Sequence, residues 1–155
     1  MRTNILRVCT IALALATAHV AFAQNANSIE GVWDVTVTVT NCQTGALIRT
    51  VRSIQGFSHD GSFTETANTY LRGSSVGTWN HDGGDNYNAT YWFFRYTSTG
   101  TFASFAYALD SIKLVDDNHF TAVGTIQDFD ANNNLISTGC FVHAATRLAA
   151  SGQGN

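Results

Sequence analysis

Few side chains in this sequence are able to do chemistry, and those few stand among aromatic residues. Tyr91, Phe93 and Arg95 occupy alternate positions, so a strand here directs all three to one face. Alternation from neighbouring phenylalanines places Glu65 and His143 on inward faces as well. A small polar group in an apolar cup is how small-molecule sites are usually built. We therefore take these five residues as candidate ligand-binding residues.

The protonation of these groups follows from burial. A buried Glu65 close to an arginine such as Arg95 is expected to be ionised and paired. A buried His143 is expected to titrate near neutral pH. Two other interpretations stay open. A bulge can reverse the phase of a strand and leave these side chains in water. Alternatively, a structural ion pair fills a packed barrel and binds nothing.

Other catalytic and metal chemistry finds little support. The sequence holds no Gly-x-Ser-x-Gly motif. Segment 128–134 (DFDANNN) has oxygen side chains at alternate positions, as a calcium loop has, but Gly139 stands where such a loop needs a glutamate. Asp and Asn are better explained here as hairpin residues that tolerate left-handed conformations. We expect no metal, because no histidine has zinc-ligand spacing from a cysteine, and no cofactor.

Composition limits the class of protein. The 155 residues are 45% hydrophobic and 12% charged, which suits one folded domain and not a disordered chain. The net charge is −3 and basic residues do not cluster, so we expect no nucleic-acid partner.

The N-terminus has the features of a secretory signal peptide. Arg2 and Arg7 precede a short apolar run, and residues 21–23 (AFA) form a cleavage motif. We expect a signal peptide over 1–23, a single barrel domain over 24–148 and a flexible tail over 149–155. The mature protein is then secreted or periplasmic and has no membrane span.

Two cysteines, Cys42 and Cys140, remain in the expected mature chain. In an oxidising compartment such a pair, separated by most of the domain, predicts a disulfide bond.

The expected domain has the pattern of strands throughout. Segment 31–40 alternates strictly between Val or Trp and polar residues, which predicts a half-buried strand. Turn residues separate the segments that follow. The further strands are expected at about 46–57, 62–70, 75–80, 87–96, 101–114, 119–128 and 135–147. About eight antiparallel strands with short turns predict an all-β barrel or sandwich.

Closure of the sheet favours the barrel. If the first and last strands pair antiparallel, nearly the same register places Trp33 opposite Arg147 and Cys42 opposite Cys140. Trp33 then points inward and the disulfide lies on the outer face. We therefore predict an antiparallel closed barrel, which leaves no free sheet edge.

Gly31, Trp33 and Arg147 together resemble the signature of the calycins, the lipocalins and fatty-acid-binding proteins. In that family a Gly-x-Trp opens the first strand and an arginine of the last strand packs on the tryptophan. The resemblance implies structural roles for Trp33 and Arg147 and a small apolar or amphipathic ligand in the cavity. One alternative is a cyclase or isomerase of the small-barrel type acting on an apolar substrate. Another is a packed, non-catalytic barrel that acts through its outer wall.

The outer wall suggests a further partner. Segments 91–94 (YWFF) and 102–109 are apolar on both faces, whereas a barrel strand is usually polar outside. Either a loop covers this part of the wall, or the chain self-associates there; we favour a homo-oligomer formed through Trp92, Phe94 and neighbouring aromatics.

Overall fold

Each segment in which apolar and polar residues alternate forms a strand in the computed structural model, which describes residues 28–149. The predicted signal peptide lies outside the described residues, as does all but the first residue of the predicted tail. The strands are β1 (Gly31–Thr40), β2 (Leu47–Phe57), β3 (Ser62–Ala67), β4 (Ser75–His81), β5 (Asn86–Tyr96), β6 (Phe102–Asp116), β7 (His119–Phe129) and β8 (Leu135–Arg147).

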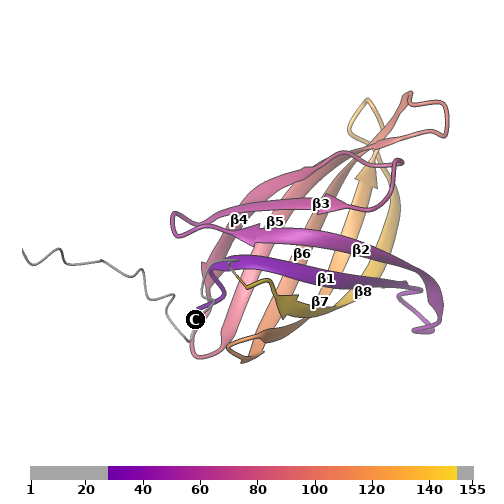
Figure 1. The fold of residues 1–155 in the computed structure, drawn as a ribbon. Coiled ribbons are helices and arrows are strands. Elements are labelled where there is room, and N and C mark those ends of the chain that lie inside the picture. The colour runs from indigo at the N-terminus through magenta and orange to yellow at the C-terminus, as the bar shows by residue number, and fades with distance from the viewer. Residues whose placement is uncertain (1–27, 150–155) are drawn as a thin grey trace, which may run out of the picture.

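The strands pair in chain order and close into an eight-stranded antiparallel barrel (Figure 1). β1 pairs with β8, and Trp33 lies opposite Arg147, which confirms the predicted closure. Cys42 and Cys140 form the predicted disulfide, with Cα atoms 5.1 Å apart. Cys140 faces outward, because the next residue, Phe141, is buried inside the barrel. No helix able to cross a membrane occurs within residues 28–149.

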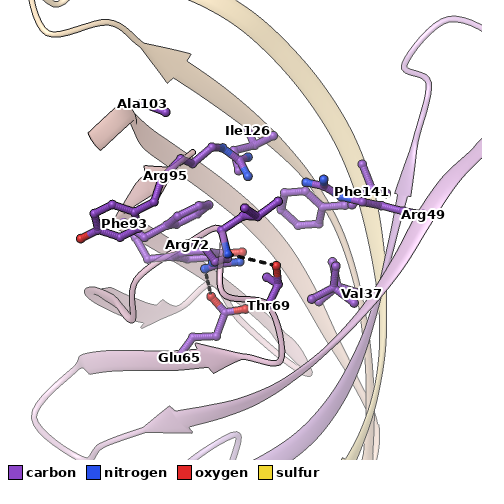
Figure 2. A pocket seen from close by; sticks show the side chains of 15 residues that line it. Val37, Arg49, Glu65, Thr69, Arg72, Phe93, Arg95, Ala103, Ile126 and Phe141 are labelled. Carbon is purple, nitrogen blue, oxygen red and sulfur yellow. Dashed lines mark hydrogen bonds and ion pairs between the residues drawn. The ribbon is translucent and has the colours of Figure 1, made fainter. Parts of the chain in front are cut away.

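One end of the barrel, here called the mouth, carries the loops after β1, β3, β5 and β7. The loop 68–74 after β3 is longer than predicted, because β3 ends at Ala67 and not near residue 70. This loop is tied to the end of β5, where the Gly73 amide donates to the Phe94 carbonyl at 2.9 Å. Arg72 thereby reaches into the barrel from the loop (Figure 2). The β7–β8 turn places Asn133 at a φ of 61°, the left-handed conformation expected of a hairpin asparagine.

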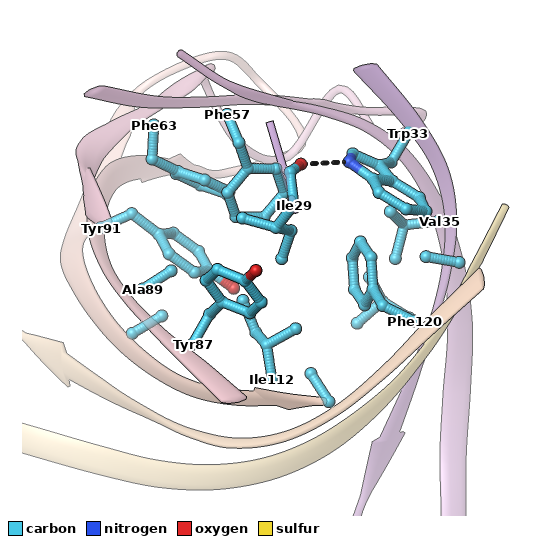
Figure 3. Close-up of a cluster of buried hydrophobic side chains, with 14 of the residues drawn as sticks. Ile29, Trp33, Val35, Phe57, Phe63, Tyr87, Ala89, Tyr91, Ile112 and Phe120 are labelled. Carbon is cyan, nitrogen blue, oxygen red and sulfur yellow. Dashed lines mark hydrogen bonds between the residues drawn. The ribbon is translucent and has the colours of Figure 1, made fainter. Parts of the chain in front are cut away.

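The opposite end, the base, is filled by aromatic side chains (Figure 3). The rings of Trp33 and Phe120 meet edge to face with centroids 4.8 Å apart, and Phe57 and Phe63 meet similarly at 5.1 Å. Ile29 closes this end, and its carbonyl accepts a 2.8 Å hydrogen bond from the Trp33 indole. The base is therefore a packed core, as expected for the inward faces of alternating strands.

Arg147 ties residues 28–30 and the β6–β7 turn to β8 at the base. Its guanidinium carbon lies 4.1 Å from the Trp33 ring centroid. It also donates hydrogen bonds to the carbonyl oxygens of Ser28, Glu30 and Asp117. The predicted packing of this arginine on the tryptophan is thus present, and burial lowers the pKa of Arg147.

Candidate functional site

A cavity of about 210 Å³ lies between the packed base and the mouth. Figure 2 shows the side chains around it. It is lined by Val37, Val39, Arg49, Val51, Glu65, Thr69, Leu71, Arg72, Tyr91, Phe93, Arg95, Tyr96, Ala103, Ile126 and Phe141. Most of these groups are apolar; the three arginines stand toward the mouth and Glu65 lies deeper.

Two aromatic rings form much of the apolar wall. Phe93 on β5 and Phe141 on β8 are both nearly fully buried. Phe141 lies flat over Gly124 of β7, where an added Cβ would stand 2.4 Å from the ring. Gly124 is therefore the residue that allows this ring to lie against the wall, since any side chain would push it into the cavity.

Two arginines flank the Phe93 ring. The guanidinium carbon of Arg72 lies 3.5 Å from its centroid, and that of Arg95 lies 5.0 Å away. Arg72 donates to Glu65 and Ser75, and Arg95 donates to Asp128. Each guanidinium is thus paired with one carboxylate and lies near the same aromatic ring.

The third arginine of the lining, Arg49 on β2, is different. Arg49 is exposed, and its side chain makes no ion pair or hydrogen bond with any residue in the described part of the chain. Its charge therefore stands at the mouth without a compensating carboxylate.

A layer of polar side chains separates the cavity from the base. We call it the polar layer, and its members are Ser53, Gln55, Glu65, Ser75, Tyr91, Asp110 and His143. Glu65 accepts a 2.7 Å hydrogen bond from the Ser75 hydroxyl. The amide of Gln55, which is fully buried, has no hydrogen-bond partner among the described residues.

Three members of the polar layer form a chain of contacts. The Tyr91 hydroxyl donates to Asp110 Oδ1 at 3.3 Å, and His143 Nδ1 lies 3.3 Å from Asp110 Oδ2. Burial raises the pKa of Asp110 well above its ordinary value and lowers the pKa of His143 to about 4. Burial, with the nearby Asp110 carboxyl, also raises the pKa of Tyr91 well above 10. Burial therefore favours the uncharged form of each of these three groups.

The predicted inward faces are confirmed for the five candidate residues. Glu65, Tyr91, Phe93 and Arg95 line one cavity. His143 does not line it, but stacks on the cavity residue Phe141 with centroids 4.8 Å apart. Whether any of the five contacts a ligand stays a prediction.

Two details of the predicted chemistry differ in the structure. The partner of Glu65 is Arg72 and not Arg95, because the loop 68–74 folds over the mouth. The expected titration of His143 near neutrality is wrong, because complete burial disfavours the imidazolium.

Four charged residues of this region were not among the candidates. Arg49 and Arg72 carry little signal, because an arginine near a strand end or in a turn is usually solvated. Asp110 and Asp128 could have been found by parity. Asp110 continues the inward series of alternate residues from Ala106 and Ala108, and Asp128 follows the inward Ile126 by two positions.

The comparisons add no family. No protein-family model matches the chain, and no curated protein matches its sequence significantly. Within the described residues, no group of three or more histidine, cysteine, aspartate or glutamate side chains has an arrangement able to hold a metal ion. The structure therefore defines the protein only as an eight-stranded closed antiparallel barrel with a disulfide bond.

Proposed function

We propose that this protein binds a small apolar or amphipathic molecule in the barrel cavity. The observation that carries the proposal is a cavity of about 210 Å³ with a mainly apolar wall, a packed base and a few charged groups at its mouth. Pockets with this division between apolar body and polar rim are typical of small-molecule sites. Glu65, Tyr91, Phe93 and Arg95 are the proposed contacts, and His143 supports the wall behind Phe141.

The calycin resemblance supports the same proposal. Arg147 packs on Trp33, the tryptophan of the Gly-x-Trp motif that begins at Gly31. The strands also close in simple up-and-down order. We propose a calycin-like carrier on these grounds. Export to the periplasm or the cell exterior is part of the proposal, because the Cys42–Cys140 disulfide suits an oxidising compartment.

Filling the cavity tests the proposal. Val51 on β2 lines the cavity and is only partly buried, so Val51→Phe reduces the space with little disturbance of the core. The wild-type melting temperature is expected to rise with a panel of small amphipathic molecules, whereas Val51→Phe shows no rise. Val76→Phe on the exposed face of β4 is the matched control and keeps the wild-type response. Equal responses of wild type and Val51→Phe would contradict binding in the cavity.

An isomerase-type enzyme is the second candidate, favoured by one observation. Glu65 and Tyr91 line the same cavity, and the Tyr91 hydroxyl is tied to the buried Asp110. A carboxylate and a neutral phenol facing one ligand are groups that can move protons. A carrier keeps its ligand and its function in Glu65→Gln and in His143→Gln, whereas an enzyme keeps its affinity and loses turnover.

A further inference from the structure

The size of the cavity and the charge at its mouth together indicate a class of ligand. We infer that the cavity takes an organic acid whose body is about one six-membered ring, with its carboxylate among Arg49, Arg72 and Arg95. This inference rests on the proposed ligand-binding function and names its ligand more narrowly.

The volume sets the size of the body. An apolar cavity of about 150 Å³ is enough to hold benzene. The present cavity, at about 210 Å³, accommodates one ring with a short substituent. Because the aromatic base closes the barrel below the polar layer, a long alkyl chain finds no room to extend inward.

The charges set the polar end. Arg72 is paired with Glu65, and Arg95 with Asp128, so these two arginines are already neutralised. Arg49 has no such partner in the described chain and leaves the site with a net positive charge. Moreover, Arg95 uses only its Nε on Asp128, and both of its terminal nitrogens are without an acceptor among residues 28–149. A carboxylate matches the planar donor pattern of a guanidinium.

The positions of these groups set the orientation. All three arginines come from the mouth end, namely from the start of β2, the loop 68–74 and the end of β5. The deeper wall consists of Val37, Tyr91 and Phe141. The carboxylate therefore stays at the mouth and the ring enters first.

Benzoate and benzamide form the matched pair of probes, because they share size and shape and differ in charge. Saturation-transfer NMR and calorimetry on the oxidised protein are expected to show benzoate binding about tenfold more tightly than benzamide. Added salt is expected to weaken the binding of benzoate and to leave the binding of benzamide unchanged. Palmitate, which is too long for the cavity, does not displace benzoate.

Variants locate the contact. Arg49→Gln is expected to lose about tenfold in benzoate affinity and to keep the affinity for benzamide. Arg52→Gln is the control, because Arg52 lies on the same strand with an exposed side chain that pairs with Asp34 outside the barrel. Its benzoate affinity stays that of the wild type.

The outcomes separate the two levels of the proposal. If benzamide and benzoate bind equally, or if palmitate binds better, the ligand class is overturned while binding in the cavity stands. If Arg49→Gln and Arg52→Gln weaken benzoate equally, a general charge effect replaces the assigned contact. If neither probe nor any molecule of the panel binds, the proposed function itself fails.

Discussion

Burial controls the charge of single residues beneath the cavity, and His143 is the clearest case. The unfolded imidazole takes up a proton as the pH falls through about 6.5, whereas the folded one does so only near pH 4. Protons therefore favour the unfolded chain in this window. The contribution of His143 to the free energy of unfolding falls by up to about 3 kcal/mol as the pH drops from 6.5 to 4.

The raised pKa of Asp110 acts in the opposite direction, because the folded carboxyl keeps a proton that the unfolded one loses. Comparison with His143→Gln separates the two effects. Urea denaturation at several pH values is expected to show the wild type gaining stability over His143→Gln as the pH rises from 4 to 6.5. Parallel curves for the two proteins would show that His143 does not titrate as its burial requires.

The inward direction of the candidate side chains could be predicted from the sequence, because strand alternation needs only parity. The partners of these side chains could not. Glu65 is paired with Arg72, which lies in a loop whose path depends on hydrogen bonds to β5. The shift of His143 depends on complete burial behind Phe141, which no local pattern reports.

At the scale of strands, a glycine of β4 allows close packing against β5. Gly77 on β4 lies opposite Tyr91, and an added Cβ there would stand 2.1 Å from the Thr90 carbonyl oxygen. Gly77→Ala is expected to lower the free energy of unfolding by at least about 2 kcal/mol, because backbone has to shift. Gly73→Ala, whose Cβ meets nothing closer than 3.7 Å, is the control and should be nearly neutral in the same denaturation experiment. If Gly77→Ala and Gly73→Ala lower the free energy of unfolding equally, β4 and β5 are packed less tightly at Gly77 than the structure shows.

The arginine of β8 ties residues 28–30 to the base of the barrel. Arg147→Met removes the stacking on Trp33 and leaves three carbonyl oxygens without their donor. A loss of about 3 kcal/mol in the free energy of unfolding is expected. Arg52→Met, which breaks only an exposed ion pair with Asp34, should cost less than about 1 kcal/mol. If the two variants lose the same stability, Arg147 does not have the structural role assigned to it.

The strands themselves were readily predicted, because turn residues such as those of segments 58–61 and 130–134 separate regular alternating segments. The exception is β3, which was expected to run to about residue 70 and ends at Ala67. Residues 68–70 have no pattern that distinguishes a strand end from a loop tied to another strand. That loop carries Arg72 to the cavity, so strand alternation alone does not predict this residue of the site.

For the whole molecule, the disulfide is the main covalent constraint. Cys42 and Cys140 are 98 residues apart in the sequence, so the bond restricts most of the unfolded chain. Reduction is expected to lower the free energy of unfolding by about 4 kcal/mol in the chain-entropy model. Guanidinium denaturation with and without reductant measures this loss. A Cys42→Ser/Cys140→Ser protein should have the free energy of unfolding of the reduced wild type, and reductant should not change it.

The exposed aromatic residues on the outer face of β5 and β6 suggest that the chain self-associates. We propose that Trp92, Phe94 and their neighbours form a contact between two copies of the chain. Phe94 is half exposed and lies within 6.0 Å of the rings of Phe102 and Phe105, so the aromatic surface is continuous. Light scattering is expected to show an oligomer that Phe94→Ala dissociates and that Ile54→Ser, on the exposed face of β2, leaves intact. A wild-type monomer at high concentration would contradict the proposal.

A native mass spectrum of the oxidised protein, followed by a denatured spectrum of the same sample, shows directly whether the cavity holds a ligand. Binding in the cavity predicts extra mass on the folded wild type that leaves on denaturation, and none on Val51→Phe, whose cavity is filled. The adduct would also report its own size, which the cavity of about 210 Å³ limits to a small molecule. A bare folded wild type, even after incubation with the panel of small amphipathic molecules, would contradict binding in the cavity.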